Sequence, residues 1–317
     1  MGLTKVAVIG AAGKVGACSA FTMILRNLSV EVIVVDADIE QAQTRLFGEW
    51  MDLEDATFRS CTRICKGNFK DASQADIIVI TAGAAQRPGE PREQLVGRNF
   101  KIIQSIYKNM KPINPNAIVL VVSNPVDILT EYFSDLAVAD GFRREQIFGS
   151  GTFLDTNRLR TELARELQVN HSSLHCYVVG MHGDSQFVAW HAASVGGIPM
   201  LKYPGMEKLD RKKHSEKIKN KAYEIIECKG ATYFGVAVCV ARIVEFIIKD
   251  SHSVIPLSVY VPANGCYISN PAVLSRNGIH RIIDLNLDEE ETQYLHSAVS
   301  TLKSLKAAGL KELEGMN

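Results

Sequence analysis

The chain has 317 residues, 46% of them hydrophobic and 22% charged, which is the composition of a globular protein long enough for two domains. Its 35 Lys and Arg residues balance its 35 Asp and Glu residues. This neutrality argues against binding to nucleic acid or an anionic membrane, which favours a basic excess, but leaves open a small anionic substrate held by local charge.

The first half of the chain alternates apolar runs with helical patterns. The runs are continuous rather than alternating, which is typical of strands buried on both faces of a parallel sheet. They cover residues 5–9, 30–35, 76–81 and 117–122. Helical patterns between them run from residue 16 to 27, over 39–56 and over 99–111. This order predicts a doubly wound α/β domain spanning residues 1–149.

A glycine-rich turn follows the first predicted strand. The segment GAAGKVG places Gly10, Gly13 and Gly16 where a helix opens, so that the backbone can approach a pyrophosphate closely. Asp36 ends the second strand, where an acid accepts hydrogen bonds from a ribose diol and repels a 2′-phosphate. Strand, glycines, helix and acid together predict a Rossmann-type domain that binds NAD rather than NADP. Val15 after Lys14 excludes a phosphate-loop NTPase, which needs Ser or Thr there.

A polar loop follows the strand at 76–81. Its sequence, AAQRPGEPR, carries Gln86, Arg87, Glu90 and Arg92. Loops are normally polar, so these side chains are either ordinary surface residues or groups that face a small charged ligand.

The second half has the pattern of an α+β domain, expected over residues 150–317. A helix is predicted over 153–168, with Asp155 or Thr156 placed to start it, followed by a strand over 172–180. Two helices, 209–228 and 231–249, are interrupted at Gly230, and a closing helix begins near Asp288. Short strands are expected between them, at 254–260, 266–269 and 281–286.

Three residues of this half could form a catalytic constellation. His182 lies just past the strand 172–180, as a loop histidine or a general acid/base. Asp155 and Arg158 are three residues apart and share a helix face. A buried Asp155 would orient His182, and Arg158 would grip a carboxylate with its planar fork. The alternative is a surface ion pair between Asp155 and Arg158, which contributes little.

Targeting and cysteine patterns point to the cytoplasm. The opening MGLTKVAVIG lacks a basic stretch followed by a long apolar run, and no run is long enough to span a bilayer. The seven cysteines are scattered apart from Cys61 and Cys65, and one C-x-x-x-C pair does not indicate a metal site. We therefore expect a cytoplasmic protein with reduced thiols and no metal.

Taken in order, these motifs resemble the L-lactate/malate dehydrogenase family over nearly the whole chain, most closely its bacterial allosteric lactate enzymes. The motifs are GAAGKVG, Asp36, TAGAAQRPGEPR, SNPVD, SGTFLDTNRLR, GMHGDS and KGATYFG. The resemblance implies that His182 exchanges the proton with the substrate, that Asp155 orients His182, and that Arg158 binds the substrate carboxylate. It further implies that Arg92 polarises the reacting carbonyl, Asn124 contacts that oxygen and the cofactor, and Thr232 lines the pocket.

The resemblance also suggests a substrate. Gln86 matches the loop position that discriminates substrates, where Arg would pair with the second carboxylate of oxaloacetate. A neutral Gln86 leaves that carboxylate unpaired, and Glu90 repels it, so pyruvate and lactate are favoured. Neighbouring Arg87 could be presented instead, which keeps malate dehydrogenase, or a broader 2-hydroxy-acid dehydrogenase, as the alternative. A short-chain dehydrogenase is a weaker rival, resting on Tyr107 and Lys111 at Y-x-x-x-K spacing.

Two further residues match an effector site of the allosteric members. Arg160 lies two residues past Arg158 and so points away from the active site, and His175 begins the segment leading to His182. The resemblance implies a subunit-interface site for fructose 1,6-bisphosphate in a homotetramer, although two ordinary cations explain the pattern equally well. Met181 and Pro91 depart from the usual lactate enzyme pattern.

Overall fold

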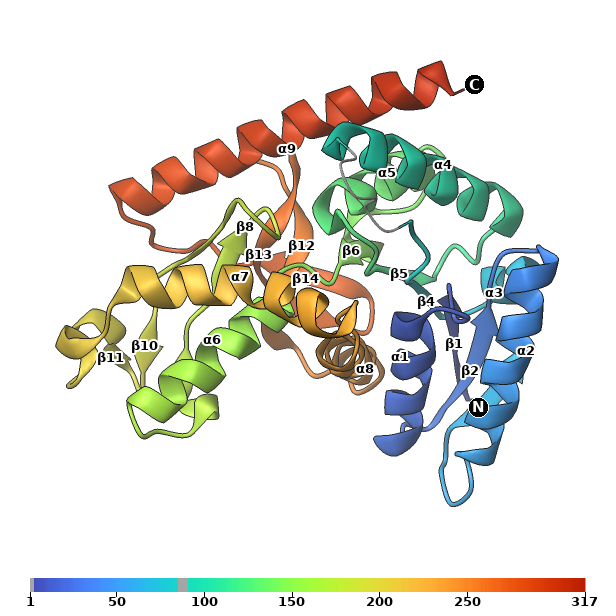
Figure 1. Ribbon diagram of the computed structural model, residues 1–317, viewed down its shortest axis with the longest axis horizontal. Coiled ribbons are helices and arrows are strands. Elements are labelled where there is room, and N and C mark those ends of the chain that lie inside the picture. Colours follow the sequence, from blue (N-terminus) through green and yellow to red (C-terminus); the bar gives the residue numbers. More distant parts are fainter. Residues whose placement is uncertain (1–2, 85–90, 317) are drawn as a thin grey trace.

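The computed structural model describes residues 3–84 and 91–316 (Figure 1). The first half forms a parallel sheet in the order β3-β2-β1-β4-β5-β6. Its strands are β1 Thr4–Ile9, β2 Val30–Val35, β3 Arg63–Lys66, β4 Ile77–Ile80, β5 Ile118–Val121 and β6 Ile147–Gly149. This is the strand order of a dinucleotide-binding Rossmann fold, so the expected doubly wound sheet is confirmed.

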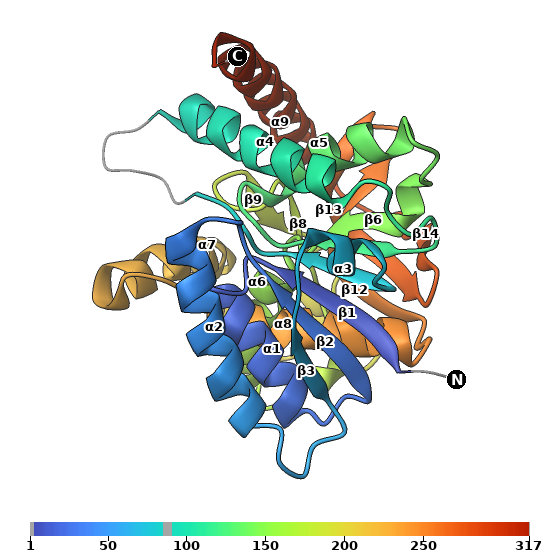
Figure 2. The same ribbon diagram turned by 90° about the vertical axis from the view of Figure 1, so that its right-hand side faces the viewer.

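Helices cover both faces of this sheet (Figure 2). Val6 and Val8 of β1 face the core that includes α1 and α2, whereas Ala7 and Ile9 face the core that includes α3, α4 and α5. Both faces are therefore buried, which is why the strands read as continuous apolar runs. The helices are α1 Lys14–Leu25, α2 Glu40–Asp55, α3 Phe69–Ser73, α4 Arg92–Met110 and α5 Val126–Val138.

The sheet continues into the second half. Ser258 of β12 pairs antiparallel with Gly149 of β6, and β13, β8 and β9 follow, so that the described residues form one eleven-stranded sheet together with β14. Its remaining strands are β8 Val178–Gly180, β9 Gln186–Val188, β12 Ser253–Val261, β13 Cys266–Ser275 and β14 Gly278–Ile282. A separate small sheet contains β7 Leu174–His175, β10 Ser194–Val195 and β11 Ile198–Pro199.

Four long helices accompany these strands in the described part of the chain. They are α6 Phe153–Glu166, α7 Arg211–Lys229, α8 Phe234–Ile248 and α9 Glu289–Gly315. Single 3-10 turns lie at η1 Arg144–Gln146, η2 His171–Ser173, η3 Met200–Lys202 and η4 Met206–Lys208. Gly230 ends α7 in the left-handed conformation, and Asp288 caps α9, both as predicted. None of the described helices is long and apolar enough to cross a membrane.

The predicted strand 172–180 is wrong as a single element. The segment divides into the 3-10 turn η2 and the strands β7 and β8, and the two strands belong to different sheets. Thr156 accepts a hydrogen bond from the Val178 N–H at 2.8 Å, and Thr152 donates one to the Val178 carbonyl at 2.5 Å. β7 pairs with β10 of the small sheet, whereas β8 pairs with β9 of the large sheet, so the chain passes from one sheet to the other between His175 and Val178.

Two predicted boundaries are also wrong. Helix α6 is capped at Thr152, so Asp155 and Thr156 lie inside its first turn rather than starting it. Their side chains bond to other parts of the chain instead of the helix end. The strand expected at 281–286 is β14, which runs from Gly278 to Ile282. It begins earlier than predicted because a tight turn at Gly278, with φ +93°, returns the chain directly from β13.

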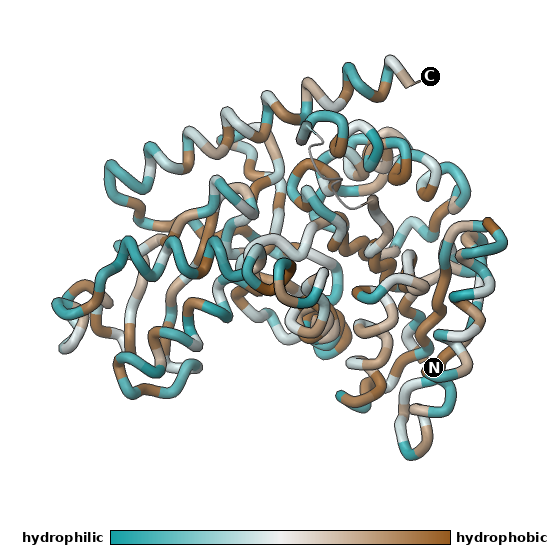
Figure 3. The backbone as a smooth tube through the Cα atoms, in the orientation of Figure 1, coloured by the Kyte–Doolittle hydropathy of each residue, from teal (hydrophilic) through white to brown (hydrophobic). Residues whose placement is uncertain are grey.

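Helix α9 crosses the molecule and packs against α4 (Figure 2). Its residues alternate between polar and apolar along its length, as expected for a helix with one buried face (Figure 3). A Cβ on Gly309 would lie 2.2 Å from Cγ1 of Val96, and one on Gly97 would lie 2.7 Å from Cβ of Glu312. Two glycines thus allow the helix backbones to approach closely.

We predict that Gly309→Ala lowers the free energy of unfolding by about 1–3 kcal/mol, because the added methyl group overpacks the α4–α9 contact. Gly48→Ala is the matched control, since Gly48 lies inside α2 with open space at its Cβ position. It should be neutral or stabilise the protein by up to about 1 kcal/mol. Urea unfolding of both variants measures the difference, and equal stabilities would contradict the close approach.

Candidate active site

The turn between β1 and α1 requires its glycines. Gly10 has φ +91°, and a Cβ there would lie 2.5 Å from the backbone nitrogen of Ala82. A Cβ on Gly16 would lie 2.5 Å from the carbonyl oxygen of Gly10, so only glycine lets α1 start this close to the turn. Gly13 is the N-cap residue of α1. The turn therefore presents the positive end of α1 over an uncluttered backbone, which fits a pyrophosphate.

Asp36 is fixed at the end of β2 beside this turn. Its Oδ2 accepts a hydrogen bond from the Ala12 N–H at 2.8 Å, and its Oδ1 accepts one from the Ala37 N–H at 2.8 Å. The carboxylate borders a cleft of about 720 Å³ that is also lined by Ile39 and by Ile102 and Ile106 of α4. A fixed acid beside apolar walls fits the ribose and base of an adenine nucleotide.

His182 lies in the loop between β8 and β9, opposite α6. Its Nδ1 is 3.0 Å from Oδ2 of Asp155, within ion-pair distance although not aligned as a hydrogen bond. Arg158 Nη1 donates to Oδ1 of the same carboxylate at 3.2 Å. The structure therefore brings together the three residues that the sequence singled out, and Nε2 of His182 faces away from Asp155.

The Asp155–Arg158 pair is buried, so the alternative of a surface ion pair is wrong. The side chains of Asp155 and Arg158 are only 3% and 10% exposed, whereas His182 is 26% exposed. A buried carboxylate is costly unless it is paired, and here one oxygen faces a guanidinium and the other an imidazole. The contact to Asp155 uses one guanidinium nitrogen, Nη1, of the planar Arg158 fork, whose geometry matches a carboxylate.

The charges of this cluster favour an ionised Asp155 and a protonated His182. Burial raises the pKa of Asp155, but the adjacent His182 and Arg158 outweigh it, so the pKa falls below its ordinary value. Burial lowers the pKa of His182, but the Asp155 carboxylate outweighs it and the pKa rises above its ordinary value. The pair is thus arranged to hold a proton on the imidazole.

Asn124 stands at the carboxyl end of β5, where its side chain is exposed. Its carbonyl accepts a hydrogen bond from Nδ2 of Asn99, a fully buried residue of α4. The side-chain amide of Asn99 also holds the first residue of the polar loop, because its Oδ1 accepts a hydrogen bond from the Ala84 N–H at 2.7 Å. Asn99 was not predicted from the sequence, although a polar residue on the apolar face of a helix is a signal for such a role.

Several predicted site residues remain predictions. Gln86, Arg87 and Glu90 lie outside the described residues, and so does the side chain of Arg92, whose backbone begins α4. Thr232 lies half-buried in the connection between α7 and α8.

Arg160 of α6 and His175 of β7 lie on neighbouring elements, outside the cluster of Asp155, Arg158 and His182. Arg160 Nε donates to the carbonyl of Cys176 at 3.2 Å, and its guanidinium lies 5.2 Å from the centroid of the Tyr177 ring. His175 directly precedes Cys176 and is exposed. The two residues are thus close in the fold, and their role as an effector site stays a prediction.

The rival pair Tyr107 and Lys111 is engaged elsewhere. Tyr107 donates a hydrogen bond to Asp140, and Lys111 forms an ion pair with the same carboxylate. Burial and the Asp140 contact raise the pKa of Tyr107 well above its ordinary value, whereas a catalytic tyrosine base needs a lowered pKa. The geometry therefore disfavours the short-chain dehydrogenase mechanism.

One cluster outside this site resembles a metal site. His191, Asp288 and Glu291 offer ligand atoms within 4.8 Å of one another. Asp288 and Glu291 form the capping box of α9, and His191 Nδ1 is 2.9 Å from Asp288. These contacts satisfy the carboxylates, and the positive end of α9 disfavours a cation there.

Comparisons with known proteins agree with this geometry. Residues 4–149 match the family model described as the lactate/malate dehydrogenase NAD binding domain, and residues 152–313 match the α/β C-terminal domain of the same family. L-lactate dehydrogenase A of Rhizopus oryzae is 46% identical, with 97% of this chain and 94% of that protein covered. L-lactate dehydrogenase 1 of Clostridium acetobutylicum is 39% identical, with 95% and 96% covered.

Solved structures give the same result. A lactate dehydrogenase from a deep-sea metagenome library superposes with a TM-score of 0.87 at 34% identity, covering 98% of this chain and 99% of that one. The minor L-lactate dehydrogenase of Enterococcus mundtii, in its ligand-bound form, gives a TM-score of 0.88 at 33% identity, covering 96% and 98%. NAD is therefore the cofactor of the domain formed by residues 4–149.

We predict that Gly16→Ala weakens NADH binding by about tenfold or more. Its Cβ would meet backbone atoms of Gly10 and Ala11, so α1 must move away from the turn that receives the pyrophosphate. Fluorescence titration with NADH measures the dissociation constant, with Gly48→Ala as the control for an added methyl group in open space. An unchanged constant in Gly16→Ala would refute the assignment of this turn.

Proposed function

Because the chain belongs to the lactate/malate dehydrogenase family, we propose that it is an NAD-dependent L-lactate dehydrogenase that reversibly reduces pyruvate to L-lactate. The observation that carries this proposal is the buried cluster of His182, Asp155 and Arg158, with contacts of 3.0 and 3.2 Å. It combines an acid/base with a carboxylate binder, as a 2-oxo acid requires. The names of the two curated relatives described above support lactate rather than malate as the product.

In this mechanism each residue has one task. Arg158 binds the substrate carboxylate with the guanidinium nitrogens that face away from Asp155. His182 donates its proton from Nε2 to the carbonyl oxygen, and Asp155 stabilises the imidazolium before that transfer. Bound NADH supplies the hydride. In the reverse direction, neutral His182 accepts the hydroxyl proton of lactate.

The polar loop and its surroundings complete the proposed site. Arg92 polarises the carbonyl, Asn124 contacts the same oxygen and the cofactor, and Thr232 lines the pocket beside Arg158. Gln86 meets the variable end of the substrate and leaves the second carboxylate of oxaloacetate without a partner. We place the NAD domain at residues 1–149 and the substrate domain at 150–317, so that Asn124 belongs to the first and His182 to the second.

We also propose a cytoplasmic homotetramer that acts in fermentation and is activated by fructose 1,6-bisphosphate. All seven cysteines are unpaired, which suits a reducing compartment. Arg160 and His175 lie close together on α6 and β7, and two cations suit a bisphosphate.

The test of the main proposal is substrate preference. We expect kcat/KM with NADH to be about a hundredfold higher for pyruvate than for oxaloacetate, since an unpaired second carboxylate costs several kcal/mol. 2-Oxoisocaproate measures tolerance of a branched substrate, and Gln86→Arg should shift preference toward oxaloacetate. A parent enzyme that prefers oxaloacetate would instead be a malate dehydrogenase.

The effector proposal has its own test. Fructose 1,6-bisphosphate should lower the half-saturating pyruvate concentration of the parent, measured by NADH oxidation at low pyruvate, and Arg160→Gln should weaken that response. The basal rate of Arg160→Gln without the effector is the control. If the sugar bisphosphate leaves half-saturation unchanged in the parent, the activation proposal fails while the dehydrogenase proposal stands.

A further inference from the structure

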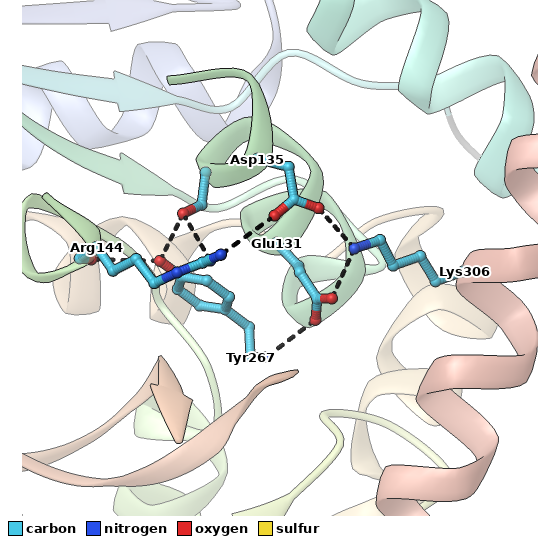
Figure 4. Close-up of polar contacts among 6 residues, drawn as sticks. Glu131, Asp135, Arg144, Tyr267 and Lys306 are labelled. Atoms are coloured by element: carbon cyan, nitrogen blue, oxygen red, sulfur yellow. Dashed lines mark hydrogen bonds and ion pairs between the residues drawn. The ribbon is translucent and has the colours of Figure 1, made fainter. Parts of the chain in front are cut away.

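Helix α5 carries a row of acidic residues that faces the second half of the chain. Asp127, Glu131 and Asp135 recur every four residues and so share one helix face. Figure 4 shows Glu131 and Asp135 of this row: Lys306 of α9 lies 2.6 Å from Glu131 and 2.7 Å from Asp135. Glu131 also accepts a hydrogen bond from the backbone N–H of Tyr267 in β13 at 2.9 Å. These contacts join α5 to α9 and β13.

Asp127, at the start of the row, has different partners. It is 1% exposed, and its Oδ2 accepts a hydrogen bond from the backbone N–H of His182 at 2.7 Å. Its Oδ1 accepts one from the hydroxyl of Ser269 in β13 at 3.2 Å. No Lys or Arg of the described residues forms an ion pair with it. A buried carboxylate with only neutral donors for partners is expensive to keep, which indicates a task beyond packing.

We propose that Asp127 is a positioning residue for His182: it fixes the backbone of the catalytic loop and places a second negative charge near the imidazole. The inference deepens the proposed dehydrogenase function and rests on it. Asp155 and Asp127 then hold His182 from two helices, α6 and α5. Because Asn124 lies only three residues before Asp127, the same short segment sets both the cofactor side and the proton-donating side of the site.

The charges around His182 agree with this role. From α6, Asp155 favours the imidazolium and Arg158 opposes it; from α5, Asp127 favours it. Asp184, in the same loop as His182, accepts a hydrogen bond from Tyr223 of α7 at 3.0 Å. On α8, burial raises the pKa of the Cys239 thiol to about 12, so this group stays neutral.

Burial also raises the pKa of Asp127 itself, while the hydrogen bonds that it accepts act in the opposite direction. Its charge therefore weakens as the pH falls. The nearby imidazolium opposes that loss, so the two groups support each other's ionised forms.

The experiment is Asp127→Asn, which keeps an acceptor for the His182 N–H but removes the charge. The variant should titrate His182 with a midpoint about 0.5–1 pH unit below that of the parent. Because pyruvate reduction needs protonated His182, its rate should fall at correspondingly lower pH, whereas lactate oxidation should gain activity at lower pH. Side-chain NMR of His182, assigned with His182→Asn, reports the midpoint without any turnover, and the two pH–rate profiles report it independently.

Glu131→Gln is the matched control, since it removes a buried carboxylate one turn further along the same helix face. It should reduce stability through the loss of the Lys306 contact and leave the His182 midpoint unchanged. If Asp127→Asn loses activity at every pH without a shift of the midpoint, Asp127 has only a structural role and the proposal is overturned.

The outcomes separate the two proposals. A parent protein that does not turn over pyruvate refutes the proposed function, while the NMR midpoint still decides the role of Asp127. If Asp127→Asn does not fold, Ser269→Ala takes its place, because it removes a donor from the same carboxylate. It should shift the midpoint in the same direction by a smaller amount, and an unchanged midpoint would again overturn the proposal.

Discussion

A carboxylate enclosed as fully as Asp155 needs a partner for each oxygen, because an unpaired charge inside a protein costs several kcal/mol. Arg158 lies on the same helix, but His182 comes from a loop between two strands, so the fold must hold that loop against α6. The hydrogen bonds of Thr152 and Thr156 to Val178 hold β8, the strand that leads into this loop, against the start of α6. The requirement to pair one charge thus dictates how α6 meets β8.

The continuous sheet connects the His182 loop to the nucleotide end of the molecule. β6 joins β12 directly, so strands that carry the glycine turn and Asp36 belong to the same sheet as β8, which leads to His182. Helix α5 adds a second connection through the contacts of Glu131 with Lys306 and Tyr267. The two halves are distinct in sequence pattern but not separate in structure, which suits a reaction in which groups from both must meet at one carbon atom.

Much of this arrangement could be predicted from the sequence. Continuous apolar runs identify the parallel strands, and a glycine turn followed by an acid identifies the nucleotide end, because both patterns are local. The break in residues 172–180 could not be predicted, since it depends on β7 and β8 pairing with strands of two different sheets, which a local pattern does not specify. The roles of Asp127 and Asn99 could not be predicted for a related reason. Each residue accepts a hydrogen bond from a distant part of the chain, and neither the motif SNPVD nor the helix around Asn99 specifies that partner.

The two hydrogen bonds that Asp36 accepts have a consequence for redesigning the coenzyme preference. Its oxygens satisfy the N–H groups of Ala12 and Ala37, so this carboxylate also holds the glycine turn to the end of β2. A basic replacement that binds a phosphorylated ribose has no acceptor and would leave both backbone donors unpaired. An engineer seeking an enzyme for NADP would therefore need to supply a new acceptor for the turn as well as a cation for the phosphate. Under the proposed assignment of Asp36 to the ribose, coenzyme selectivity and the rigidity of the turn depend on the same carboxylate.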